Sequence, residues 1–321
     1  MRLIKSILSI SIGLSLSSTL LAYEEPTVDS SPAKQSLIEL FNNYSPCCVR
    51  VRCTKEGKPC FLSGFFVSPD GYILTAVTHG SDFYVETAMG QITTAQKIGE
   101  DEILSICLLK ANLSKEQTVP CFSLMRSVPP VKIGESIVSL SCKLGQAVAP
   151  QKGYVTDMCD RCLGHEFPIT YVRSTLPIES GDSGGAVLNR QGNLYGMLLH
   201  AIEGTRETFY IPQWALERIY QNLLILGHVP HGYAGMHVET CWDKQQHQVC
   251  LRIVSIDAGS PGEQYKFKVG DILTHLNGVE LYTLEDLKNY LFLAADQGVL
   301  WFTVIRGNKT LQLPLKMRKH K

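Results

Sequence analysis

The segment Gly181-Asp182-Ser183-Gly184-Gly185 sets a serine among glycines, a pattern that suits nucleophilic chemistry. Glycine permits the tight turn that leaves the Oγ of Ser183 exposed. The amides of Gly181 and Ser183 can then point at one place, where the oxyanion of an acyl-transfer reaction would form. A serine nucleophile also needs a histidine base and a carboxylate that orients the base. The segment therefore predicts a nucleophile turn whose two partners must come from elsewhere in the chain.

Eleven cysteines form the second group of residues that could do chemistry. Cys53 and Cys60 flank a turn-like stretch, and Cys241 and Cys250 flank a polar stretch between two strand-like runs. Both pairs are predicted to be disulfides that staple hairpins, as an exported chain permits. The odd total leaves at least one thiol unpaired or intermolecular.

Cys159 and Cys162 form a CxxC motif with His165 close behind. Zinc would need a fourth ligand, and none stands at standard spacing, so no metal is expected. A redox switch is the second interpretation of the motif. A structural disulfide is the default interpretation, and no cofactor is expected anywhere in the chain.

Residues 1–22 have the pattern of a secretory signal peptide. Arg2 and Lys5 precede the short apolar run Ile7–Leu21, and Ala22 is a small residue for cleavage. The mature chain is therefore expected in the periplasm or cell envelope, and no later segment could span a membrane. The charge is balanced, with 30 basic and 30 acidic residues, so no nucleic-acid-binding surface is expected.

Short apolar and β-branched runs broken by Gly, Pro, Asn and Asp predict an all-β barrel between Cys48 and Leu198. The expected strands are Val49–Cys53, Phe65–Ser68, Tyr72–Thr75, Ser105–Leu109, Ile137–Leu140 and Gly185–Leu188. Helices are expected at Ser36–Asn43 before the barrel and at Pro212–Leu226 after it.

A second domain is predicted beyond Gly227 and Pro230. Its one helix, Leu284–Ala294, follows Thr283 as N-cap. The expected strands are Tyr233–Val238, Cys250–Ile256, Ile272–Leu276, Leu300–Ile305 and Thr310–Leu315.

Two parts of the chain resemble one known family. Leu176–Asn189 (LPIESGDSGGAVLN) resembles the nucleophile segment of trypsin-fold serine proteases, especially the HtrA/Deg family. The second domain resembles the PDZ module of that family in its segments Val269–Leu273 (VGDIL) and Leu276-Asn277-Gly278. The resemblance implies a mostly β fold: a trypsin-like double β-barrel at residues 23–228, then a PDZ domain at residues 229–321. It also implies a homotrimer.

The other two triad positions depart from the family pattern. In the family, the Thr that ends the strand Ser63–Thr75 is followed by two residues and then the catalytic His. Here Thr78 stands at the position of that His, and His79 comes one place late. A one-residue slip turns a side chain away. His79 is thus either the base, through a bulged turn, or an exposed loop residue. Ser105 stands where the family has its catalytic Asp, and Asp101 matches an earlier, non-catalytic Asp.

In the PDZ domain the resemblance places a peptide carboxylate on the amides of Ala234, Gly235 and Met236. Three helix residues would supply side-chain pockets: Leu287, Tyr290 and Leu291. The alternative is a PDZ fold used for packing or assembly.

Two functions remain from the sequence. One is a pseudoprotease of envelope quality control. It would bind unfolded or misfolded proteins in the former substrate cleft of the barrels and C-terminal peptides on the PDZ domain. The alternative is an active serine endopeptidase that uses Ser183 with His79 as a displaced base. The residues Thr78 and Ser105 favour the first function, because it does not require other groups to replace the His and Asp that are missing at these two positions.

Overall fold

The computed structural model describes residues 34–77, 79–125, 128–162, 165–201, 207–243, 248–295 and 298–319. The predicted signal peptide, residues 1–22, and Thr78 lie outside the described residues. Within these ranges, every helix is too short or too polar to traverse a bilayer.

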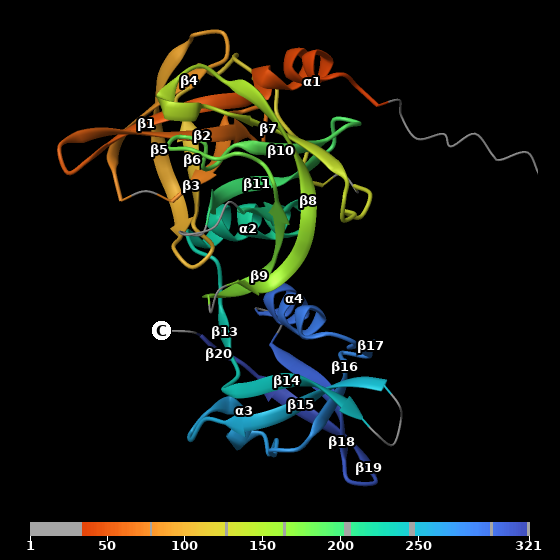
Figure 1. Ribbon diagram of the computed structural model, residues 1–321. Coiled ribbons are helices and arrows are strands. Elements are labelled where there is room, and N and C mark those ends of the chain that lie inside the picture. The colour runs from red at the N-terminus through yellow and green to blue at the C-terminus, as the bar shows by residue number, and fades with distance from the viewer. Residues whose placement is uncertain are drawn as a thin grey trace, which may run out of the picture. The chain divides into compact units, whose positions relative to one another are not determined.

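Two closed six-stranded barrels follow one another along the chain (Figure 1). The first has the order β1-β2-β3-β6-β5-β4 and the second β10-β11-β12-β9-β8-β7. The first barrel consists of β1 (Cys48–Lys55), β2 (Lys58–Phe66), β3 (Tyr72–Ala76), β4 (Ser81–Thr87), β5 (Ile92–Asp101) and β6 (Ile106–Ala111). The second consists of β7 (Ser136–Ser141), β8 (Ala149–Cys162), β9 (His165–Ser174), β10 (Ala186–Asn189), β11 (Leu194–Ala201) and β12 (Thr208–Pro212).

Three short helical elements belong to the barrels. Helix α1 (Leu37–Tyr44) begins at a capping box, in which the hydroxyl of Ser36 accepts from the amide of Glu39 and the Glu39 carboxylate accepts from the amide of Ser36. It is followed by the 3₁₀ turn η1 (Ser45–Cys47), and a second turn, η2 (Lys143–Gly145), follows β7. These elements confirm the helix predicted at Ser36–Asn43.

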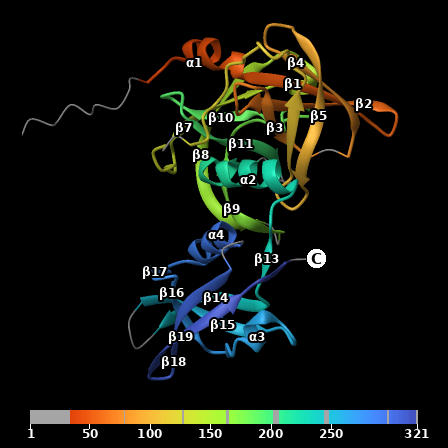
Figure 2. The ribbon, with the colours of Figure 1, turned by 180° about the vertical axis from the view of Figure 1, so that it is seen from behind.

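Helix α2 (Gln213–Leu226) covers the barrels and leads the chain towards β13, as the view from behind shows (Figure 2). Its buried residues Leu216, Ile219 and Leu223 recur at helical spacing and join the core of the barrels. The helix ends at Gly227, whose φ of 75° suits glycine at a C-cap.

The last part of the chain is a PDZ fold with its own core. Its sheet has the order β14-β15-β16-β18-β19, with β17 beside β16, and β13 pairs separately with β20. The elements are β13 (Gly232–Tyr233), β14 (Met236–Asp243), β15 (Gln248–Ile256), α3 (Pro261–Gln264), β16 (Ile272–Leu276), β17 (Val279–Glu280), α4 (Leu284–Ala294), β18 (Val299–Arg306), β19 (Lys309–Lys316) and β20 (Arg318–Lys319). Helix α4 begins at Thr283 through a second capping box, as predicted.

The single strand predicted at Tyr233–Val238 is wrong, because two strands occupy that stretch. Strand β13 ends at Tyr233 and β14 begins at Met236. Gly235 between them has a φ of 66°, a left-handed conformation that breaks an extended strand.

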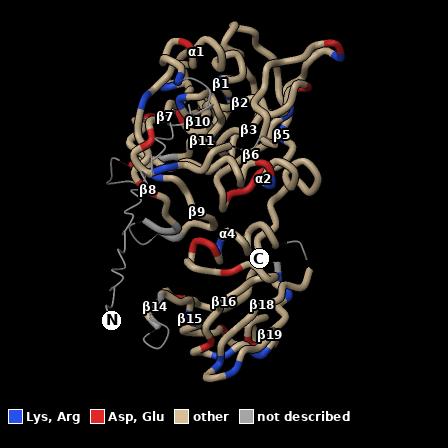
Figure 3. Tube along the Cα trace, turned by 90° about the vertical axis from the view of Figure 1, so that its right-hand side faces the viewer, with Lys and Arg blue, Asp and Glu red and all other residues tan. Residues whose placement is uncertain are grey.

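Basic and acidic residues are interspersed over both barrels and the PDZ sheet (Figure 3). This distribution accords with the formal net charge of +0.

The two predicted hairpin staples occupy directly opposed positions. Cys53 faces Cys60 in the β1–β2 register, and Cys241 faces Cys250 in the β14–β15 register. Opposed residues of antiparallel strands have Cα atoms about 4.5–5.5 Å apart, within the range that a disulfide spans. The Sγ atoms of Cys241 and Cys250 lie 2.7 Å apart. Register thus permits both bonds, and the bonds themselves stay a prediction.

We predict that non-reducing peptide mapping of protein from an oxidising compartment will find Cys53–Cys60 and Cys241–Cys250 as disulfides. Each closes a short loop, so reduction should lower the free energy of unfolding by about 2–3 kcal/mol per bridge in a denaturant titration. In a Cys53→Ala/Cys60→Ala control, reductant should lower the free energy of unfolding by the contribution of the Cys241–Cys250 bridge alone. Recovery of all four as alkylated thiols would refute the assignment.

Candidate functional site

The turn that carries Ser183 is held by the buried carboxylate of Asp182. Asp182 is 0% exposed, and its oxygens accept from the Ser141 hydroxyl (2.7 Å) and the Glu179 amide (2.8 Å). The side-chain amide of Gln151 contacts the same carboxylate at 3.3 Å. A buried carboxylate is stable only when such donors replace water. Asp182 therefore fixes the turn from inside the second barrel.

The same turn lies directly against the first barrel. The amide of Ser63 in β2 donates to the carbonyl of Ser183 at 2.9 Å, and the Ser63 hydroxyl donates to the carbonyl of Gly181 at 2.7 Å. A Cβ on Gly184 would clash with the Ser63 carbonyl and lie 2.8 Å from the amide of Ala76. Gly184 is required there both for this close approach and for its φ of 90°.

The geometry leaves the oxyanion donors available. Gly181 has a φ of 96°, and Ser183 is half-buried. In the described part of the chain, neither the amides of these two residues nor the Ser183 Oγ has a hydrogen-bond partner. This arrangement could hold an oxyanion beside the Ser183 hydroxyl.

His79 is an exposed side chain in the loop after β3. Its side chain is 64% exposed, and its Nδ1 lies 3.7 Å from Oε1 of Glu102, itself 69% exposed. Such a surface pair contributes little stability. The contact that the structure gives His79 is therefore with Glu102, and Thr78 before it lies outside the described residues.

Ser105 lies beside the segment that leads to Thr78 and His79. Its carbonyl accepts from the amide of Val77 at 3.1 Å, and its own amide donates to Glu102 at 3.2 Å. The φ of Ser105 is 55°, a left-handed conformation just before β6. The end of β3 and residue 105 are thus neighbours, as a base and its orienting group would need to be.

Asp101 does not stand behind His79. It is 6% exposed, and one oxygen accepts from the amide of Leu104 at 2.8 Å. The other lies 2.8 Å from Nε2 of His231, in the segment that leads into the PDZ sheet. Both carboxylate oxygens of Asp101 therefore have partners other than His79.

Cys142 lies close to the turn but is unsuited to replace the serine. It is fully buried, and its amide donates to the Ser63 hydroxyl at 2.7 Å. Burial raises the pKa of Cys142 to about 11. At neutral pH it is a thiol, and the thiolate is the nucleophilic form.

The carboxylate loop predicted in the PDZ domain is braced through its carbonyls. The carbonyl of Ala234 accepts from Gly262 at 2.8 Å, and that of Gly235 accepts from Asp257 at 2.9 Å. A Cβ on Gly235 would clash with Ser260, so a bulky residue there would disturb the domain itself. Met236 follows as the first residue of β14.

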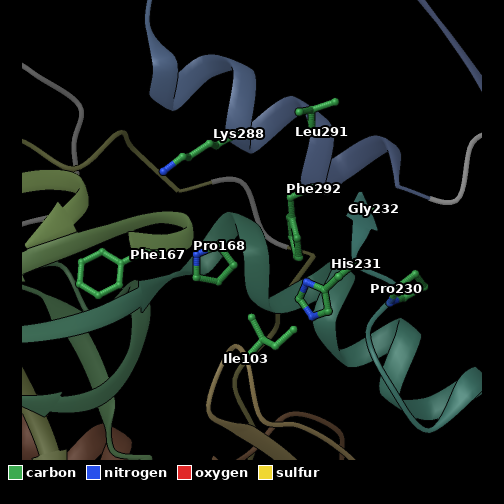
Figure 4. A pocket seen from close by; sticks show the side chains of 9 residues that line it. All are labelled: Ile103, Phe167, Pro168, Pro230, His231, Gly232, Lys288, Leu291 and Phe292. Carbon is green, nitrogen blue, oxygen red and sulfur yellow. The ribbon is translucent and has the colours of Figure 1, made fainter. Parts of the chain in front are cut away.

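The three predicted helix residues of the PDZ domain have different surroundings. Leu287 is 4% exposed and packs in the PDZ core, while Tyr290 is half-buried against it. Leu291 is also half-buried and lines a cavity of about 460 Å³ where α4 meets the barrels (Figure 4). The other labelled residues of this cavity are Ile103, Phe167, Pro168, Pro230, His231, Gly232, Lys288 and Phe292.

Helix α4 is tied to the barrels at two further places. The Asn289 carboxamide accepts from the Thr170 amide and donates to the Thr170 hydroxyl, each at 3.0 Å. The Phe292 ring packs edge-on against Trp214 of α2, with centroids 6.1 Å apart. Local sequence patterns do not predict these contacts, because they join residues far apart in the chain.

The CxxC motif lies at the junction of β8 and β9. Cys159 is half-buried, and the side chains of Cys162 and His165 lie outside the described residues. Among the residues that are described, no cluster of three or more His, Cys, Asp or Glu side chains could hold a metal ion.

The site residue that sequence reasoning missed is Ser63. The sequence predicts Ser63 only as the start of a strand, yet its amide and hydroxyl both hold the nucleophile turn. The short Ser-Gly step that precedes the apolar run Phe65–Val67 is the only sequence signal for it.

Comparison with family models matches each half of the structure separately. A model of the trypsin-like peptidase domain matches residues 62–197, and a PDZ domain model matches residues 252–306. The first match runs from β2 to β11 within the barrel pair, and the second from β15 to β18 within the PDZ domain.

Curated relatives match over most of the chain. Serine endoprotease DegS of Haemophilus influenzae is 24% identical over 265 residues, covering 79% of this chain and 75% of DegS. A probable periplasmic DegP-like serine endoprotease of Chlamydia trachomatis is 24% identical over 267 residues, which is 79% of this chain. The chain spans about half the length of this DegP-like relative, 53%.

Solved structures share the fold. The HtrA-type protease AlgW with a tripeptide has a TM-score of 0.74 at 19% identity, covering 89% of this chain and 98% of that one. The serine endoprotease from Yersinia pestis has a TM-score of 0.66 at 19% identity, covering 90% and 100%. In its two barrels, its one PDZ domain and these relatives, the chain is similar to serine proteases of the HtrA/Deg family.

Proposed function

We propose that this chain is an exported envelope protein of protein quality control that binds extended polypeptides with little or no peptidase activity. Residues 1–22 would be the signal peptide, residues 23–228 the barrel domain that holds the polypeptide, and residues 229–321 the PDZ domain. The observation that carries the proposal is a contrast within one site. The turn of Ser183 is braced from both barrels, whereas His79 contacts Glu102 and a serine stands at position 105.

The physical reason is that a serine hydroxyl is a weak nucleophile without a general base. A serine at position 105 cannot stabilise an imidazolium as a buried carboxylate does. The family resemblance places the base at Thr78, whose hydroxyl cannot act as that base. Two of the three catalytic roles are therefore unfilled at their usual positions.

An active endopeptidase is the second candidate function. The available amides of Gly181 and Ser183 favour it, because they suit an oxyanion. It requires that the loop of His79 changes its register and brings the imidazole to Ser183.

The PDZ domain would bind the C-termini of client chains on the amides of Ala234, Gly235 and Met236. Support comes from the bracing of this loop through its carbonyls, which leaves the opposite side of the peptide units to a ligand. Solved HtrA-type relatives contain a tripeptide or a decapeptide, according to their descriptions.

We predict that the mature protein cleaves unfolded casein no faster than its Ser183→Ala variant, because no base activates the hydroxyl. Both proteins should suppress casein aggregation equally, and a fluorophosphonate probe should label Ser183 only slowly. The measurements are casein turnover at neutral pH and light scattering. A clear Ser183-dependent rate would overturn the proposal in favour of the endopeptidase.

The double variant Thr78→His/Ser105→Asp should restore activity, because it supplies both a base and its orienting carboxylate. Asp tolerates the left-handed conformation at position 105 better than most residues do. Triad members act as a unit, so the double variant should exceed either single variant by at least about tenfold in casein turnover.

Adding Ser183→Ala to the double variant is the control, and it should remove the gained activity. If both single variants and the double variant are equally inert, the cleft differs from an active one beyond these two positions.

Peptides with free apolar C-termini should bind the full mature chain better than the same peptides with amidated C-termini. The carboxylate makes charge-assisted hydrogen bonds to the loop amides, so amidation should weaken binding by about tenfold or more in calorimetry. An internal substitution in the peptide is the control and should change affinity much less. Equal binding of both forms would show that the loop is not a carboxylate site.

A further inference from the structure

A cavity of about 400 Å³ adjoins the nucleophile turn, and none of the functions considered so far uses it. One wall is the β1–β2 hairpin, with Lys55, Lys58 and Phe61. The other wall comes from the second barrel, with Leu144 and Ser180. The cavity, here called the lysine pocket, therefore lies where the two barrels meet.

The lysine pocket adjoins the turn that carries Ser183. Its wall residue Ser180 directly precedes Gly181, and the Ser180 carbonyl accepts from the Leu144 amide at 2.6 Å. A Cβ on Gly181 would lie 2.6 Å from the carbonyl of Cys142, so this loop and the turn are in direct contact. An extended chain that passes Ser183 can thus place a nearby side chain in the pocket.

The inner side of the lysine pocket is apolar. The Phe61 ring lies under Gly145, where an added Cβ would be 2.6 Å from the ring. Arg50 lies behind this ring, with Cζ 6.0 Å from its centroid, but it donates to Gly145 and pairs with Glu86. The positive charge of Arg50 is therefore already matched, and the ring can pack against methylene groups.

The outer side of the lysine pocket carries two lysines that face each other. Lys55 and Lys58 are direct partners in the β1–β2 register, across a two-residue turn whose φ angles are 51° and 74°. Both side chains are exposed. Like charges directly opposite on a hairpin are destabilising, so this pair weakens the hairpin that carries it.

The surrounding acidic groups do not neutralise this pair. Glu56 lines the lysine pocket as well and offsets one of the two charges. Glu179, which directly precedes the wall residue Ser180, already pairs with Lys143 at 2.5 Å. One positive charge remains, over an apolar inner side, beside the nucleophile turn.

We propose that the lysine pocket binds the side chain of an Asp or Glu residue in an extended polypeptide that lies in the barrel cleft. The carboxylate would bridge Lys55 and Lys58, and the methylene groups would pack on Phe61. The inference rests on the proposed polypeptide-binding function of the barrels and gives it a preference for acidic segments.

The test uses fluorescence anisotropy of labelled peptides with the full mature chain. The peptides have amidated C-termini, which removes the PDZ carboxylate contact, and differ only in carrying Glu, Gln or Lys at the same positions. At low salt the Glu peptide should bind about fivefold more tightly than the Gln peptide, and high salt should reduce this difference. The Lys peptide should bind most weakly.

The variant Lys55→Gln/Lys58→Gln should lower binding of the Glu peptide to the level of the Gln peptide. Binding of the Gln peptide should stay unchanged. The matched control is Lys309→Gln/Lys316→Gln, which removes two exposed lysines from β19 and should leave the preference intact. Lys58→Glu should reverse the preference towards the Lys peptide. Loss of the like-charge pair should not lower the melting temperature of the double variant.

The outcomes separate the two proposals. If Glu and Gln peptides bind the unmutated protein equally, the lysine pocket is overturned while polypeptide binding stands. If the Glu preference survives in the Lys55→Gln/Lys58→Gln variant, it arises elsewhere, and the lysine pocket is again overturned. If no peptide binds at all, both the pocket and the binding function of the barrels fail.

Discussion

The buried carboxylate of Asp182 is the constraint on which the site depends. A carboxylate without water must be met by hydrogen-bond donors, and here they come from Ser141, Gln151 and Glu179. These three residues lie on separate segments of the second barrel, so a single side chain gathers them around the turn. The orientation of the Gly181 and Ser183 amides follows from that anchoring. The position of the Ser183 hydroxyl therefore depends on a carboxylate that is itself fully buried.

The turn also joins the two barrels, which gives it a structural role apart from any reaction at Ser183. Ser63 of the first barrel bonds to the carbonyls of Gly181 and Ser183, and Gly184 packs on the end of β3. A substitution in this turn would cost stability whether or not the serine reacts.

Local sequence signals predicted the helices that have capping residues at their ends. Ser36 and Thr283 are the N-caps of α1 and α4 and form capping boxes there, and Gly227 is the C-cap of α2. The mostly β class and the barrel-plus-PDZ organisation followed from motif resemblance. The expected barrel strands do not include β4, β5, β8, β9, β11 and β12, because pairing with partner strands, which local sequence does not specify, stabilises them.

The parts of the site that sequence could not supply are the long-range contacts. The pairing of Asp101 with His231 joins residues 130 positions apart, and nothing local to either side chain points to the other. The bracing by Ser63 is of the same kind, across 118 positions to Gly181. The direction of the His79 side chain depends on a loop conformation that no periodicity specifies.

Phe292 belongs to the PDZ helix α4 by sequence, yet it packs within the core of the barrels. Its ring contacts Trp214, and the guanidinium of Arg218 lies 5.6 Å from the ring centroid. Burying such a side chain contributes about 1.5–3 kcal/mol, which is a large share of the stability of a small domain. Recombination that exchanged one PDZ module for another would remove this contribution from the barrels. The two domains are therefore expected to evolve as a single inherited unit, although a linker separates them in the sequence.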